Sequence, residues 1–184
     1  MELFGFIEVH KTFSEFDYVN SKFKRYGREV VLNGAQLIGR SEDGTHGGEL
    51  ASATSDIVFV KFKETVINQI QSETGDTVHF SGGILRMKNV SVLFIFAYLK
   101  CSVGMNDENQ RRMEQISLLI KIHGLPWILY ADFNMLPEEL SKSGWPQFLK
   151  AEIVIPTGAT STLKNVSGRI IDYLMVHRSI FGAY

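Results

Sequence analysis

Asp132 and Asn134 are the side chains whose types and spacing most directly suggest chemistry. They follow the apolar run 127–131, which is typical of a buried strand. Side chains two residues apart on a strand point the same way, and ligands of α/β proteins bind at the carboxyl ends of strands. A carboxylate and a carboxamide there predict a site for a metal ion or a proton. The alternative is a turn, in which Asp and Asn bond their own backbone.

A second acid, Asp172, lies inside the apolar segment 170–176. Burying a charge costs free energy unless the charge has a partner. Asp172 therefore belongs either to a functional site or to a structural pair, with Arg169 or with a Thr hydroxyl as the partner. Glu8 is a third acid between apolar neighbours, and its alternative is an outward-facing position on a strand.

These three acids all fall at or near the end of an expected strand, with Asn134 close to one of them. Carboxylate and amide oxygens are the ligands that a hard divalent cation such as Mg²⁺ prefers. A bound Mg²⁺ stabilises charge on a phosphate and helps to form an attacking hydroxide. The residue types therefore predict metal-assisted phosphate chemistry, provided that the acids converge in space.

The strands that would position these acids are read from apolar runs and from alternation of apolar and polar residues. Asn33-Gly34 predicts the tight turn of a hairpin over residues 29–38. The expected strand segments are 3–9, 29–38, 57–62, 77–80, 84–88, 90–98, 127–131 and 170–176.

Two helices have clear end signals. Thr12 and Glu15 form a capping box that begins the first helix, which Gly27 ends. Asn106 caps the second, which Gly124 ends. A short helix is expected at 137–140, segment 63–76 is ambiguous, and segment 144–169 is rich in turn residues. Strands with intervening helices indicate an α/β fold, with some antiparallel pairing around 77–98.

Composition sets the broad class. The chain has 184 residues, with 45% hydrophobic and 21% charged, so we expect one soluble domain over residues 1–184. A net charge of −1 gives no overall basic field. The single Cys101 excludes an internal disulfide and a Cys-based zinc site. Segment 90–99 is too short to span a bilayer, and no signal-peptide pattern begins the chain, which predicts an intracellular protein. The oligomeric state stays open.

Basic side chains gather at two places on the expected helices. A solvated helix face and a phosphate-contacting patch are the two interpretations of each group. The groups are Lys22, Lys24, Arg25 and Arg28 near the end of the first helix, and Arg111 with Arg112 in the second.

Several motifs, taken in order, match a known family. The most specific are Phe6-Ile7-Glu8-Val9-His10, Ala131-Asp132-Phe133-Asn134 and Arg169-Ile170-Ile171-Asp172-Tyr173. The glycine-rich segment 44–48 and Tyr98, followed by Asn109 and Arg112, agree in order. With these motifs the chain resembles the endonuclease/exonuclease/phosphatase superfamily of metal-dependent phosphodiesterases, over nearly its whole length.

The resemblance implies a role for five residues. Glu8 would ligate Mg²⁺, or Mn²⁺ in its place. Asp132 would orient or deprotonate the attacking water, and Asn134 would bond the phosphate or position Asp132. Tyr98 would donate a hydrogen bond to a phosphate oxygen, and Asp172 would orient a catalytic histidine.

The resemblance also implies a fold: a two-sheet α/β sandwich of mixed strands with helices on the outer faces, lacking the family's first and last strands. The sequence departs from the family at Ala131, where Gly is usual, in the absence of a first-strand Asn, and in the absence of a terminal Asp-His pair after Asp172.

Two hypotheses about function follow from the retained motifs and these departures. The first is a Mg²⁺-dependent phosphodiester hydrolase, nuclease-like, whose attacking water is activated by Asp132. Its partner would be nucleic acid or another phosphodiester. The second is a degenerate, non-catalytic relative that binds a phosphate-bearing partner or another protein.

Overall fold

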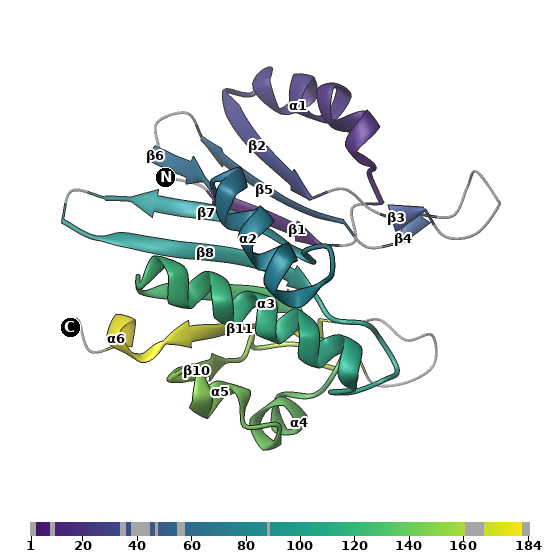
Figure 1. Cartoon of the computed structure of the whole chain (residues 1–184), viewed down its shortest axis with the longest axis vertical. Coiled ribbons are helices and arrows are strands. Elements are labelled where there is room, and N and C mark those ends of the chain that lie inside the picture. The colour runs from purple at the N-terminus through teal and green to yellow at the C-terminus, as the bar shows by residue number, and fades with distance from the viewer. Residues whose placement is uncertain are drawn as a thin grey trace.

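A computed structural model of the chain describes residues 3–7, 10–33, 36–37, 45–46, 48–54, 58–87, 89–160 and 168–181 (Figure 1). Its strands are β1 (Leu3–Ile7), β2 (Arg28–Asn33), β3 (Gln36–Leu37), β4 (Thr45–His46), β5 (Glu49–Thr54), β6 (Val58–Lys61), β7 (Phe80–Arg86), β8 (Ser91–Tyr98), β9 (Trp127–Asp132), β10 (Ala151–Val154) and β11 (Asp172–His177). Its helices are η1 (Phe13–Glu15), α1 (Phe16–Lys24), α2 (Glu64–Thr74), α3 (Asp107–His123), α4 (Pro137–Lys142), α5 (Trp145–Phe148) and α6 (Arg178–Phe181).

The larger layer is a six-stranded mixed sheet in the order β10-β11-β9-β8-β7-β6. Strands β8 and β9 are parallel, and the other neighbouring pairs are antiparallel. A parallel pair needs a long crossover connection, and α3 supplies it here. The carboxyl ends of β8 and β9 therefore meet at one edge of the sheet, which is where Tyr98 and Asp132 fall.

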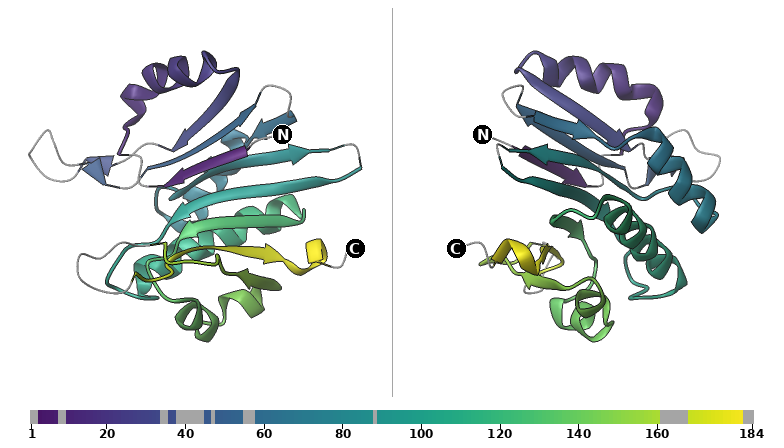
Figure 2. Two further views of the ribbon diagram at one scale, coloured as in Figure 1. Left: turned by 180° about the vertical axis from the view of Figure 1, so that it is seen from behind. Right: turned by 60° about the vertical axis from the view of Figure 1, so that its left-hand side comes forward.

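A second sheet, in the order β1-β5-β2, packs against part of the first. The two sheets approach closely at Gly5, where a Cβ atom would lie 1.8 Å from Cδ1 of the Phe96 ring. A larger side chain at this position would push β1 away from β8, because a close-packed core has no room to absorb it. Strand β1 contacts β8, and Figure 2 shows β1 on the opposite side of the six-stranded sheet from α3.

Helices cover the outer faces of both sheets (Figure 1). Helix α3 buries Ile116 in one apolar cluster with Leu93 and Leu129 of the six-stranded sheet, and α2 adds Ile70 to the same cluster. Helix α1 covers the smaller sheet, in a separate cluster around Val30. Among the described residues, no helix is both long enough and apolar enough to cross a membrane.

The predicted two-sheet α/β sandwich is confirmed, and most predicted elements lie within a few residues of their expected places. Asn106 caps α3 by accepting a hydrogen bond from the Asn109 N–H at 3.1 Å. Gly124 ends this helix with a φ of 59°, a left-handed conformation that glycine adopts without strain. The ambiguous segment 63–76 forms α2, which ends in the same way at Gly75.

One prediction about the N-terminal third is wrong. The hairpin expected over 29–38 does not form, because β2 pairs with β5 and β3 pairs with β4. A turn signal such as Asn33-Gly34 favours a local reversal but does not determine which strands pair, and Gly34 lies outside the described residues. The first helix begins with the 3₁₀ turn η1, although the Glu15 carboxylate accepts the Thr12 N–H at 3.1 Å as the capping box requires.

The first part of segment 144–169, residues 144–160, is more ordered than its turn-rich composition suggests. It contains α5 and β10, and β10 joins the six-stranded sheet as an edge strand beside β11. The final strand begins at Asp172 rather than at 170, and α6 follows it. Elements of four residues are too short to show periodicity, so the sequence pattern could not reveal them.

Candidate active site

Tyr98, Asp132 and Asp172 form one row across three neighbouring strands, called here the site row. Asp172 lies directly opposite Asp132 in the antiparallel β11–β9 pair, and Tyr98 lies beside Asp132 in the parallel β8–β9 pair. The Cβ atoms of directly opposed residues are about 4.5–5.5 Å apart. Strand pairing therefore places two half-buried carboxylates side by side, although they are far apart in the sequence.

Asn134 joins this row through a turn and not through strand alternation. Strand β9 ends at Asp132, and Asn134 has a φ of 52°, so the expectation that the two side chains point the same way along a strand does not apply. The Asn134 N–H donates to Oδ1 of Asp132 at 2.9 Å, and its side-chain amide donates to the Leu99 carbonyl at 2.8 Å. The turn interpretation is confirmed by these bonds, and this turn fixes the Asp132 carboxylate. The site interpretation stays a prediction.

Asp172 is held at the start of β11 by Thr160, which sequence reasoning did not single out. The Thr160 hydroxyl oxygen accepts the Asp172 N–H and the Ile171 N–H, each at 2.9 Å. The Thr160 N–H donates to the Arg169 carbonyl at 3.0 Å. These bonds involve the Asp172 backbone, whereas the sequence suggested a Thr as a partner for the Asp172 carboxylate.

Tyr98 has a different environment from the two acids, because only 3% of it is exposed. Its carbonyl accepts a hydrogen bond from Nη1 of Arg112 at 2.7 Å. Arg112 is itself buried, with 7% exposed, whereas its neighbour Arg111 is exposed. Arg112 therefore belongs to neither the solvated face nor the phosphate patch that the sequence suggested.

The Arg112 guanidinium is part of a charged cluster beneath the site row. Its Nη2 donates to Glu108 at 2.7 Å, and Glu108 also accepts from Nζ of Lys100 at 2.8 Å. The Lys100 hydrogen bond, followed by the Arg112 charge, lowers the pKa of the Glu108 carboxyl. Glu108 therefore stays ionised at neutral pH and keeps a counter-charge beside Arg112.

His79 lies near this cluster and gives a test of its electrostatics. Burial, and then the charge of Arg112, lower the pKa of His79 from 6.5 to about 4. Between these two values the unfolded chain binds a proton that the folded chain does not, so stability falls as the pH drops from about 6.5 to about 4. The expected loss is on the order of 3 kcal/mol.

Urea unfolding at several pH values, in the wild type and in His79→Gln, measures this loss. The variant cannot take up the proton, so its free energy of unfolding should depend less steeply on pH over that window. Parallel pH profiles for the wild type and the variant would show that His79 has the same pKa in the folded and the unfolded chain.

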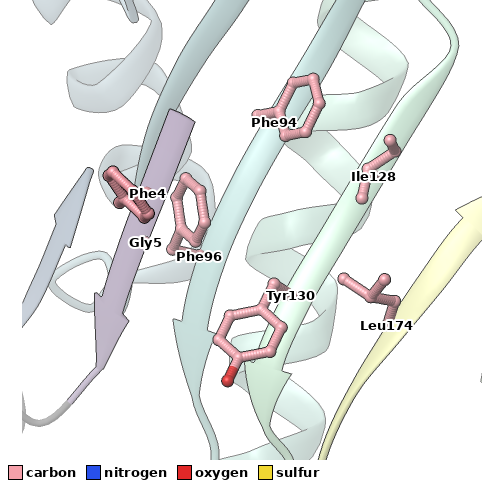
Figure 3. Close-up of a pocket in the computed structure, with 7 residues that line it drawn as sticks. All are labelled: Phe4, Gly5, Phe94, Phe96, Ile128, Tyr130 and Leu174. Carbon is pink, nitrogen blue, oxygen red and sulfur yellow. The ribbon is translucent and has the colours of Figure 1, made fainter. Parts of the chain in front are cut away.

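An apolar groove continues from the site row along the same face of the six-stranded sheet. Each row residue has an apolar or aromatic neighbour two positions away on its own strand: Phe96, Tyr130 and Leu174. Figure 3 shows the Tyr130 hydroxyl pointing toward the carboxyl end of β9. Burial, and then the charges of Asp172 and Asp132, raise the pKa of Tyr130, so this phenol stays protonated as a donor. Strand alternation from Asp132 would have identified Tyr130, but the sequence-based prediction omitted it.

Glu8, the predicted metal ligand, lies outside the described residues. Strand β1, which precedes it, points toward the same end of the molecule as β8 and β9 (Figure 3). In the part of the chain that the structure describes, no three His, Cys, Asp or Glu side chains gather closely enough to hold a metal ion. The paired carboxylates of Asp132 and Asp172 are nevertheless the hard oxygen donors that suit Mg²⁺.

Known structures share this architecture. The human Nocturnin catalytic domain with bound sulfate has a TM-score of 0.62 and 14% identity, over 96% of this chain and 69% of that one. The endonuclease domain of TRAS1, a telomere-specific non-LTR retrotransposon, has a TM-score of 0.56 and 15% identity, over 85% of this chain and 69% of that one. An endonuclease/exonuclease/phosphatase family protein from Leptotrichia buccalis has a TM-score of 0.59 and 12% identity, over 95% and 74% of the two chains.

The fold is that of the endonuclease/exonuclease/phosphatase family. No protein-family model and no curated protein matches the sequence itself. Identities this low establish the fold alone, and the structures that share this fold include both the TRAS1 endonuclease domain and a mannosyl-6-phosphatase from Bacteroides thetaiotaomicron. The activity of this chain must therefore be argued from its own residues.

Proposed function

We propose that this chain is a Mg²⁺-dependent phosphodiester hydrolase in which water is the nucleophile. The observation that carries the proposal is the register of β9 and β11, which opposes Asp132 and Asp172 directly at the edge of the sheet. Two carboxylates at this spacing repel each other, and a divalent cation or a shared proton relieves that repulsion. Such a pair suits metal-assisted or acid–base chemistry.

The three predicted acids and Asn134 each have a role in this proposal. Asp132 orients and deprotonates the attacking water, because the Asn134 N–H bond at 2.9 Å fixes its carboxylate. Asp172, beside Asp132, either holds a proton or provides a carboxylate oxygen as a metal ligand. Glu8, which follows β1, supplies a metal ligand. A bound Mg²⁺, or Mn²⁺, would neutralise charge on the phosphate.

One further side chain, Tyr130, would act on the substrate phosphate. The Tyr130 phenol, protonated and directed toward the site row, is a hydrogen-bond donor to a phosphate oxygen. The role first suggested for Tyr98 is to donate in the same way, but with 3% exposed this side chain has little access to a substrate. The substrate is nucleic acid or another phosphodiester.

The burial of Tyr98 favours a second candidate function, a module that binds phosphate without hydrolysing it. Both candidate functions predict binding of a phosphate group, but only the hydrolase predicts its hydrolysis. A non-catalytic relative would hold a phosphate-bearing partner at the site row with no dependence of product formation on Mg²⁺.

A substrate panel tests the proposal. The purified chain is incubated with abasic DNA, single-stranded DNA, RNA and an inositol phosphate, with Mg²⁺ or with excess EDTA. We expect at least one of the nucleic acids to be hydrolysed with Mg²⁺ present and EDTA to abolish the product, whereas hydrolysis of the inositol phosphate alone would indicate a phosphomonoesterase. Hydrolysis that persists in EDTA would contradict the metal dependence, and binding without product on the whole panel would favour the non-catalytic module.

A further inference from the structure

The main chain at the carboxyl end of β8 accepts hydrogen bonds from, and donates them to, side chains outside its own sheet. The Tyr98 carbonyl accepts from Arg112 at 2.7 Å. The Lys100 N–H donates to Oδ1 of Asn109 at 2.8 Å, and the Lys100 carbonyl accepts from Nδ2 of the same side chain at 3.0 Å. Arg112 and Asn109 both lie on α3, so one helix fixes this strand end.

The peptide between these contacts links the strand end to the site row. The Leu99 N–H donates to the Asp132 carbonyl at 2.9 Å, and the Leu99 carbonyl accepts from Nδ2 of Asn134 at 2.8 Å. A shift of the Tyr98–Leu99 peptide would therefore move Asp132 and the turn that orients its carboxylate.

Arg112 is the charged member of this set, and its chemistry suits a rigid contact. Its guanidinium is planar and permanently charged, and it bridges the Tyr98 carbonyl and the Glu108 carboxylate, each at 2.7 Å. Hydrogen bonds with one ionised partner are shorter and stronger than neutral ones. The guanidinium carbon also lies 5.8 Å from the centroid of the Tyr98 ring. Two contacts to one residue restrict both its backbone and its side chain.

We propose that Arg112 is a positioning residue for the hydrolysis described above, on which this inference rests. It acts through the Tyr98 carbonyl. By fixing the end of β8, it keeps Asp132 correctly placed relative to the reacting phosphate. Catalytic groups must be held within about 0.5 Å of their productive positions. Arg112 touches neither substrate nor metal in this role.

The functional test compares Arg112→Gln and Arg112→Lys with the matched control Arg111→Gln, which removes a neighbouring exposed charge. We expect kcat of Arg112→Gln to fall by about 10²-fold with little change in KM, since a displacement near 1 Å has an effect of that size. Arg112→Lys should recover part of kcat, because an ammonium can still reach the carbonyl. The control should match the wild type.

Amide hydrogen exchange at Leu99 and Lys100 provides a readout independent of activity. Exchange at these amides should be at least tenfold faster in Arg112→Gln than in the wild type, at a temperature where both are folded, and unchanged in Arg111→Gln. A lower melting temperature with unchanged kcat would mean a purely structural role and would overturn the inference.

The two proposals fail in different ways. Unchanged exchange together with wild-type kcat removes the role of Arg112 and leaves the hydrolase proposal intact. A wild-type protein that hydrolyses nothing on the panel removes the hydrolase proposal and the catalytic role of Arg112 with it, even if exchange responds as expected.

Discussion

Asp132→Asn is expected to reduce Mg²⁺-dependent hydrolysis by about 10²–10⁴-fold, because it removes the group that takes a proton from the attacking water. The amide of the new side chain keeps an oxygen at the position that accepts the Asn134 N–H at 2.9 Å. The turn after β9 should therefore survive, and the melting temperature should stay within a few degrees of the wild type. Steady-state kinetics and thermal melts on the same preparations measure both effects.

The matched control for this experiment is Asp17→Asn, which makes the same chemical change at an exposed position in the first turn of α1. It should leave kcat and KM unchanged. Hydrolysis that survives Asp132→Asn at the wild-type rate would come from another site or from a contaminating enzyme. Loss of activity together with a collapsed melting transition would instead mean that the turn itself depends on the carboxylate.

The convergence of Asp132 and Asp172 was accessible to sequence reasoning because each acid interrupts or ends a strongly apolar segment. Such segments are the most reliable sign of a central strand, and polar groups at their ends are confined to one edge of the sheet. The local sequence pattern cannot predict the register of β9 and β11. This register places the two residues directly opposite each other rather than one position apart. Register depends on packing against α3 and β8, and these contacts join segments distant in the sequence.

The supporting residues were hidden for a related reason. Thr160 bonds two N–H groups at the start of β11, yet in sequence it is one polar residue in a turn-rich stretch. The family resemblance included Arg112 but gave it no role, and only the packing of α3 decides that Arg112 is buried and its neighbour Arg111 exposed. Hydrogen bonds to a distant backbone leave no periodicity in the chain, so no local signal could have separated these residues from ordinary surface ones.

Asp172→Asn separates a catalytic acid from a structural one through opposite effects on stability. Asp172 faces Asp132 directly, and like charges opposed across an antiparallel pair destabilise a sheet. Removing one charge from a functional pair should therefore leave the melting temperature unchanged or slightly higher, while kcat falls by about 10²-fold or more. A structural acid behaves differently, because its loss leaves a buried partner unsatisfied at a cost of about 1–3 kcal/mol.

That cost would lower the melting temperature by roughly 2–12 °C in a chain of this size, which a melt in EDTA resolves easily. Added Mg²⁺ sharpens the comparison, since an ion that binds only the folded state raises its melting temperature. We expect Mg²⁺ to stabilise the wild type and the control Glu114→Gln, an exposed change in the middle of α3, and to have little effect on Asp172→Asn. Asp172 would be a structural residue if Asp172→Asn melted several degrees lower, kept its turnover per folded molecule and still responded to Mg²⁺. The hydrolase proposal would then lose the carboxylate pair on which it is based.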